Sequence, residues 1–238
     1  MNNGLISVAM ATYNGEKYIK EQIESILCNL KENDELVISD DGSTDNTINI
    51  IKELSGKDNR IKLYDGPQKG IKQNFANAIS HCNNKYIFLS DQDDIWKKDK
   101  VKKVIKEFDN PNTLVVQHDA EVINQDLNVV LPSYFKYRKC GRGILKNIYK
   151  GTYLGCCMAF DSKLKKHILP IPENIDMHDT WIGIIGDVYG KNKFINDKLI
   201  SYRRHGDNNS DIFHHHNIKT MIHDRICLIK ELIKEKRK

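Results

Sequence analysis

The first half of the chain repeats one pattern, in which a short apolar segment ends in polar residues. The segments cover residues 5–12, 35–39, 61–64 and 86–89, and apolar residues at helical spacing follow them. Continuous apolar runs of this length are typical of strands that are buried on both faces of a sheet. Their alternation with helices requires right-handed crossovers and predicts a parallel sheet that is covered by helices on both faces.

The second half of the chain shows a different order of expected strands and helices. After a basic helical segment at 97–108, we expect strands at 113–123, 129–130, 152–160 and 194–202, and helices at 179–189 and 217–238. Residues 134–151 are polar and basic, which favours a mobile loop or a segment that faces an acceptor. Since no repeat or linker interrupts the 238 residues, we expect one α/β domain. It would have a parallel half at 1–110, a mixed half at 111–214 and a C-terminal amphipathic helix at 215–238.

The composition excludes several classes of protein. Hydrophobic residues make up 39% and charged residues 29% of the chain, which is enough to bury a core. The six cysteines include no Cys-x-x-Cys pair, so we expect free thiols rather than a zinc ribbon or disulfides. The net charge of +5 suits contact with phosphates or an anionic lipid surface, and we expect no nucleic-acid partner. Without a cationic leader or an apolar run of about 18 residues, the chain is expected to be cytoplasmic.

Polar side chains follow three of the expected strands. The strand ends carry Thr12 to Asn14, Asp40 with Asp41, and the segment Asp91 to Asp94. Because ligands of parallel sheets bind beyond the carboxyl ends of the strands, these residues should converge on one crevice. Several carboxylates in one crevice repel each other unless a divalent cation or a donor-rich ligand joins them. The sequence therefore favours a nucleotide with Mg²⁺ or Mn²⁺, although neither a P-loop nor a Gly-x-Gly-x-x-Gly motif is present.

Three motifs carry a resemblance to a known family. The segments MATYNGEKYI, VISDDGSTDNT and FLSDQDDIW resemble, in order and spacing, the family 2 glycosyltransferases. Later segments, GTYLGCCMAF, MHDTW and YRRHGDNNS, are most similar to the bacterial rhamnosyltransferase-like branch. This resemblance implies a GT-A fold with a Rossmann-like mixed sheet and an inverting, metal-dependent transfer. It implies dTDP-rhamnose as the favoured donor, with a UDP-hexose or UDP-N-acetylhexosamine as the alternative, and a cell-surface polysaccharide or lipid-linked oligosaccharide as the acceptor.

The resemblance also assigns roles to residues of this chain. Asp179 would be the general base, and Asp93 and His205 would bind the metal. The nucleotide-sugar would contact Thr12, Tyr13, Asn14, Asp40, Asp41, Lys69, Lys72, Asn74, Asp91 and Gln92, with either Asp40 or Asp41 on the base. The acceptor side would include Gly155, Cys156, His178 and Trp181.

Simpler interpretations of some of these residues stay open. Asp179 could also cap the helix that follows it. Lys69, Lys72 and Asn74 could form a solvated helix face, and Trp181 could belong to the core as readily as it could stack on a sugar. For Cys156 a nucleophilic role is improbable.

Two other functions remain open at this level. A nucleotidyltransferase also uses paired aspartates, but its glycine-rich basic loop is missing after the first strand. A binding module that has lost catalysis is disfavoured by the intact Asp179.

The C-terminal segment allows two interpretations. Its stripe of isoleucines could pack on the catalytic domain, or it could lie at the inner face of a membrane together with the basic tail as a peripheral contact. The preceding His214 to His216 favour a solvated turn over a metal site, because consecutive residues point to different sides.

Overall fold

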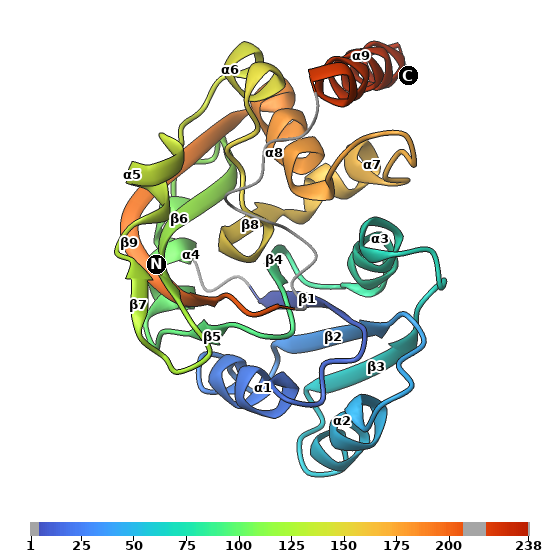
Figure 1. The fold of residues 1–238 in the computed structure, drawn as a ribbon, viewed down its shortest axis with the longest axis vertical. Helices are drawn as coiled ribbons and strands as arrows, with labels where there is room; N and C mark the ends of the chain where they lie inside the picture. The colour runs from blue at the N-terminus through green and yellow to red at the C-terminus, as the bar shows by residue number, and fades with distance from the viewer. Residues whose placement is uncertain (1–4, 207–217, 238) are drawn as a thin grey trace.

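A computed structural model describes residues 5–206 and 218–237 of the chain. These residues form one mixed sheet of nine strands in the order β3-β2-β1-β4-β8-β6-β9-β5, with β7 paired to β6 (Figure 1). The parallel half contains β1 (Ile6–Thr12), β2 (Glu35–Asp40), β3 (Ile61–Asp65) and β4 (Tyr86–Ser90). The predicted parallel half of the sheet is therefore confirmed.

The helices of this half cover both faces of the sheet, as Figure 1 shows. The helices are α1 (Ile19–Leu27), α2 (Thr47–Ser55) and α3 (Ile71–His81). Alternate residues of β1 point to opposite faces, so Val8 packs in the core cluster that contains α1 and α2. Its neighbour Ala9 packs with Phe75 of α3 on the other face. Because both faces are buried, the strands carry the continuous apolar runs that made them predictable.

The second half is mixed, as expected. It contains β5 (Ile95–Trp96), α4 (Lys100–Glu107), β6 (Thr113–Ile123), β7 (Val129–Leu131), β8 (Met158–Asp161), α7 (Lys165–Ile168), α8 (His178–Tyr189) and β9 (Lys191–Arg203). Strand β8 is antiparallel to both β4 and β6, whereas β9 runs parallel to β6 and antiparallel to β5. The antiparallel β8 thus joins the two halves into one continuous sheet.

Two segments of this half differ from expectation. Residues 134–151 contain two short helices, α5 (Tyr134–Arg138) and α6 (Ile144–Tyr149), in place of a loop. The Ser133 hydroxyl caps α5 by accepting the Lys136 amide, and the Asn147 side chain ties α6 to the backbone around it. The strand expected at 152–160 is shorter, since a 3-10 turn, η1 (Gly155–Cys157), precedes β8. A second such turn, η2 (Ser162–Leu164), follows β8.

The final helix, α9 (Ile218–Glu235), exposes its isoleucines. Ile222, Ile226, Ile229 and Ile233 are 41 to 54% exposed, while Cys227, Leu228 and Leu232 face the protein. The interpretation that the isoleucine stripe packs on the catalytic domain is therefore wrong. Among the residues described, no helix combines the length and apolar content that crossing a membrane requires. The predicted turn at His214 to His216 lies outside the described residues.

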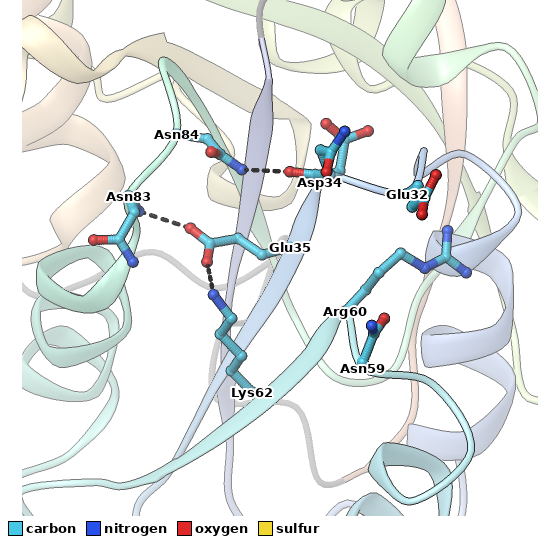
Figure 2. A pocket seen from close by; sticks show the side chains of 9 residues that line it. Glu32, Asp34, Glu35, Asn59, Arg60, Lys62, Asn83 and Asn84 are labelled. Atoms are coloured by element: carbon cyan, nitrogen blue, oxygen red, sulfur yellow. Dashed lines mark hydrogen bonds and ion pairs between the residues drawn. The ribbon is translucent and has the colours of Figure 1, made fainter.

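A polar network covers the amino ends of the first strands, on the edge opposite the polar strand exits (Figure 2). The buried Glu35 carboxylate accepts hydrogen bonds from the Ser7 hydroxyl (2.6 Å), the Asn83 amide (2.7 Å) and the Lys62 ammonium (2.5 Å). Burial alone would raise the pKa of Glu35, but the hydrogen bonds from Lys62, Ser7 and Asn83 outweigh it and lower this pKa. The hydrogen bonds of this network pair its polar groups with one another, and they stabilise the amino ends of the first strands.

Replacing Glu35 should show how much this network contributes to the free energy of unfolding. We expect Glu35→Gln to lower the free energy of unfolding by about 1–3 kcal/mol at neutral pH, since it removes a charged acceptor from buried donors. A lowered folded-state pKa stabilises above the usual glutamate pKa of 4.5, and this stabilisation is lost as the pH falls through the folded value. Urea titrations at several pH values should therefore show the two proteins converging in acid. The exposed Glu53→Gln is the control, and an equal loss there would contradict the account.

Candidate active site

A cleft of about 1450 Å³ opens at the carboxyl ends of β1, β2 and β4. Its opposite wall is formed by the start of α8, the η1 turn and residues of α5, α6 and α9. Ten residues that the sequence assigned to a site line this cleft: Thr12, Tyr13, Asp41, Asn74, Asp91, Gln92, Asp93, Gly155, His178 and Asp179. Residues from both halves of the sheet therefore meet in one place, as the strand exits predicted.

The loop after β1 is held in place by side chains. The Gln92 side-chain amide accepts a hydrogen bond from the Tyr13 amide (2.9 Å) and donates one to the Tyr13 carbonyl (3.0 Å). A Cβ atom on Gly15 would lie 2.4 Å from this amide, so glycine is required for the close approach. Asn14, at a φ of 49°, accepts the Thr44 amide and does not line the cleft. Gln92 and Asn14 thus fix the loop that presents Tyr13.

The two aspartates after β2 have different environments. The Asp40 carboxylate accepts four hydrogen bonds within its own loop, from the Thr12 hydroxyl and from the Gly42 amide and the Ser43 amide and hydroxyl. Asp41 lines the cleft and accepts the amides of Gln68 and Gly70 at 2.7 and 2.8 Å. Of the two, Asp41 is therefore the residue at the surface that a ligand would meet.

Carboxylates gather where β4 ends. The Asp91 and Asp94 oxygens and the Cys156 sulfur lie within 4.8 Å of one another. Burial, followed by repulsion from Asp93, raises the pKa of Asp91 to about 7 and also raises that of Asp94. One Asp94 oxygen accepts the Arg203 amide, and its other oxygen is buried without a hydrogen-bond partner. The cluster thus keeps a buried carboxylate oxygen that no hydrogen bond from the described residues satisfies.

Next to this cluster, His205 follows the end of β9 and contacts Asp93. Its Nε2 lies 2.8 Å from the Asp93 carboxylate, and both side chains are largely buried. Its ring packs on that of Tyr18, with the centroids 4.7 Å apart. Carboxylate oxygens with one imidazole form a donor set that suits a divalent cation such as Mg²⁺ or Mn²⁺. The residues present therefore fit the metal that the sequence indicated.

Sequence reasoning did not identify a lysine beneath the cluster. Lys100, in the first turn of α4, is fully buried, and its Nζ donates to the Cys156 carbonyl at 2.8 Å. The ammonium lies 3.8 Å from the centre of the Trp96 ring, and burial lowers its pKa to about 8. The sequence of a basic helix does not show which of its lysines is buried, so the position of Lys100 could not be predicted.

Asp179 lies in the first turn of α8, on the other wall of the cleft. Burial raises its pKa to about 6, while the Thr180 amide and hydroxyl oppose this shift and Asp176 adds to it. Its charge also adds to the raised pKa of Asp91, after burial and Asp93, so the two carboxylates interact across the cleft that both line. The cap position of α8 is occupied by Met177, so the interpretation of Asp179 as the helix cap is wrong.

Beside it, His178 is buried and stacks on Phe75 with the ring centres 4.1 Å apart. Neither of its ring nitrogens has a hydrogen-bond partner, and burial lowers its pKa to about 3. The nearby Gly155 leaves room for it, since a Cβ atom there would lie 3.1 Å from Nε2. A neutral imidazole therefore lines the cleft next to the carboxylate.

Some residues of the expected site lie elsewhere. Trp181 is 2% exposed and donates its indole N–H to the Ile168 carbonyl, so its interpretation as a sugar-stacking residue is wrong. Cys156 is buried under the cleft, and burial raises the pKa of its thiol, which disfavours a nucleophilic role. The Lys72 ammonium holds the backbone of Glu173 and Ile175, and the exposed Lys69 does not line the cleft.

Comparison with known proteins identifies the class. The fold is that of the GT-A glycosyltransferases. It is similar to S. aureus TarS residues 1–349 in complex with UDP-GlcNAc, with a TM-score of 0.75 and 20% identity over 96% of this chain and 66% of that one. It is also similar to the mannosyltransferase PcManGT from Pyrobaculum calidifontis in complex with GDP-Man and Mn²⁺, with a TM-score of 0.64 and 16% identity over 83% and 56% of the two chains.

The sequence comparisons give the family. The model of glycosyl transferase family 2 matches residues 7–169, and the chain belongs to this family. It is 44% identical over 102 residues to the dTDP-rhamnosyl transferase RfbG of Shigella flexneri, across 40% of this chain and 35% of RfbG.

A second relative matches over a longer stretch. The chain is 33% identical over 162 residues to the UDP-Glc:alpha-D-GlcNAc-diphosphoundecaprenol beta-1,3-glucosyltransferase WfgD of Escherichia coli, across 65% of this chain and 63% of WfgD. In both RfbG and WfgD, the match spans less than two thirds of the relative's length.

The Gln92 side chain offers a direct test of how the cleft is built. We expect Gln92→Ala to speed hydrogen exchange at the Tyr13 amide by about tenfold or more, since two hydrogen bonds of roughly 1 kcal/mol each are lost. The matched control is Gln73→Ala, whose amide donates to the Ile171 carbonyl away from this loop. Unchanged exchange at Tyr13 in Gln92→Ala would contradict the positioning role.

Proposed function

We propose that this chain is an inverting glycosyltransferase that moves a sugar from a nucleoside diphosphate to a hydroxyl group of a saccharide. The observation that supports it most is the placement of two acidic groups, carried by different elements, in one cleft. The cluster at Asp91 to Asp94 suits a cation and a diphosphate, and Asp179 suits a base. A single-displacement reaction needs these two functions on opposite sides of the sugar.

The donor would bind along the strand exits of the parallel half. Thr12, Tyr13 and Asp41 would contact the base, with Asp41 accepting the imide N–H of uracil or thymine. Asn74 supports this wall, since its amide donates to the Thr12 carbonyl and its own oxygen has no partner. The similarity to RfbG favours dTDP-rhamnose, and the similarity to WfgD supports a UDP-hexose as the alternative.

Mg²⁺ or Mn²⁺ would be held by Asp93 and His205, with Asp91 next to them. When bound there, such a cation neutralises the charge that develops on the departing diphosphate. The raised pKa values of Asp91 and Asp94 support this role, because buried carboxylates without a cation repel each other. The structure of PcManGT in complex with GDP-Man and Mn²⁺ gives a precedent within the fold.

Asp179 would take the proton of the acceptor hydroxyl. In one step the acceptor oxygen forms a bond to the anomeric carbon, the bond from that carbon to the diphosphate oxygen breaks, and the hydroxyl proton moves to the Asp179 carboxylate. His178 and Gly155 lie beside Asp179 and would meet the acceptor. The acceptor would be a growing cell-surface polysaccharide or a lipid-linked oligosaccharide, and the enzyme would work in the cytoplasm.

A release assay tests this function. With a panel of nucleotide-sugars, including dTDP-rhamnose, UDP-glucose and UDP-N-acetylglucosamine, we expect release of nucleoside diphosphate from one preferred donor in the presence of Mg²⁺ or Mn²⁺. Chelation and Asp93→Ala should each abolish release, because the cluster then lacks its cation or a ligand. Asp126→Ala, on an exposed hairpin, is the control. Full turnover in excess chelator would refute the metal role, and no release from any donor with a range of acceptors would refute the function.

The role of Asp179 as the base can be tested by the pH dependence of turnover. Asp179 acts as a base only when ionised, so turnover should rise with pH through about 6 and level off above it. We expect Asp179→Asn to keep donor binding and to lower turnover by roughly 10² to 10⁴. The control is Asp176→Asn, an equal charge change three residues away, which should retain turnover and move the acidic limb to lower pH. An Asp179→Asn enzyme with normal turnover would place the base elsewhere.

A further inference from the structure

Large apolar side chains are exposed along one rim of the cleft. On α6, Leu145 is 83% and Tyr149 76% exposed. On α9, four isoleucines with spacings of four, three and four residues form one exposed stripe. We define the apolar rim as Leu145, Tyr149, Ile222, Ile226, Ile229 and Ile233. An exposed apolar surface of this kind next to a cleft usually marks a site of interaction.

The two helices of the apolar rim are neighbours in the structure. The Arg225 guanidinium of α9 donates to the Tyr149 carbonyl and lies 5.7 Å from the centre of the Tyr149 ring. Tyr149 and Ile222 both line the cleft, so the rim begins at the cleft and runs outward along α9. Figure 1 shows α6 and α9 together at one end of the molecule. The rim is therefore one surface that is continuous with the cleft.

This surface is strongly cationic. Residues 134–150, which contain α5 and α6, include six lysines and arginines and no aspartate or glutamate. Five of the six are exposed: Lys136, Lys139, Arg142, Lys146 and Lys150. On α9, Lys219 and Lys230 are exposed as well. A row of apolar side chains between cations matches the interface of an anionic membrane.

The acidic groups of α9 point away from this surface. Glu235 is buried against His167, and Glu231 accepts a hydrogen bond from Asn174 of the protein body. Asp224 lines the cleft. The outward side of α9 therefore carries apolar and cationic residues, whereas its acidic residues face the rest of the protein.

We propose that the apolar rim docks on an anionic lipid surface. The isoleucines and Leu145 enter the headgroup region, and the cations of residues 134–150 and of α9 contact lipid phosphates. A symmetric dimer through the same surface is disfavoured, since it would bring two cationic segments together. Docking places the mouth of the cleft beside the lipid surface, where an acceptor carried by a lipid is within reach. The docking surface rests on exposure and charge and does not depend on the proposed glycosyl transfer.

The apolar rim is defined without the basic tail. In the tail, Lys234 pairs with Glu231 at 2.6 Å. The rim, in contrast, presents side chains from two helices that pack on the domain. Its side chains are at least 41% exposed, so substitutions there should disturb folding less than substitutions in the core.

Flotation with vesicles tests the proposal. The purified chain is mixed with vesicles of phosphatidylcholine alone or with roughly one third phosphatidylglycerol, at salt concentrations of about 0.05 to 0.5 M. We expect binding to the anionic vesicles only, weakening as salt increases. The double variant Ile226→Gln, Ile229→Gln should lower the bound fraction about tenfold, because two inserted apolar side chains are lost. The matched control is Val129→Gln, Val130→Gln on β7, which changes two valines that are 53 and 55% exposed.

Each outcome decides the proposal. Loss of binding in the α9 double variant, with control and wild type equal and all three melting at one temperature, supports it. The proposal is refuted if the two double variants show the same bound fraction, or if binding does not depend on lipid charge and salt concentration. Sedimentation velocity tests the alternative that a second copy of the chain binds the rim. A dimer that the α9 variant abolishes would assign the rim to that second copy and would overturn the lipid proposal. None of these measurements uses a sugar donor, so a failed transfer assay leaves this test intact.

Discussion

The carboxylates at the end of β4 impose the constraint on which the site depends. Asp91, Asp93 and Asp94 lie within four residues, and Asp93 and Asp94 are buried while Asp91 is half-buried. Three charges in this position are costly unless cations surround them. The protein supplies part of this balance with the buried Lys100 and with Arg203, whose guanidinium Nε donates to the Asp93 carbonyl and whose backbone amide donates to Asp94. The remaining positive charge is what a bound divalent cation would provide.

Around this cluster, the walls of the cleft are fixed by side chains that bond to backbone. Gln92 holds Tyr13, Asp40 holds its own loop, and Lys100 holds the η1 turn through the Cys156 carbonyl. The η1 turn also adjoins the wall that carries Asp179, since Gly155 lies against His178. Several loops of the site are therefore held in place by side chains, which lowers the entropic cost of ordering them around a substrate.

Much of this arrangement could be predicted from the sequence, because the pattern of apolar residues shows which strands are buried on both faces of the sheet. Strands β1, β2 and β4 carry apolar runs that end in polar residues, so both the parallel sheet and the convergence of Asp41 and Asp91 were predictable. Where periodicity is ambiguous, the prediction failed. Helix α9 carries two apolar rows, and only packing decides that Leu228 and Leu232 face the protein while the isoleucines face outward. Trp181 and Lys100 show the same limit, since residue type alone does not tell a tryptophan in the core from one in the cleft, or a buried lysine from a solvated one.

Anomalous diffraction from crystals grown with Mn²⁺ and a nucleoside diphosphate tests the central claim most directly. The account predicts a manganese peak within bonding distance of Asp93 and His205, with the diphosphate between that peak and the wall that carries Asp179. A nucleotide bound in the cleft with no manganese near Asp91 to Asp94, or bound away from Asp41, would contradict it.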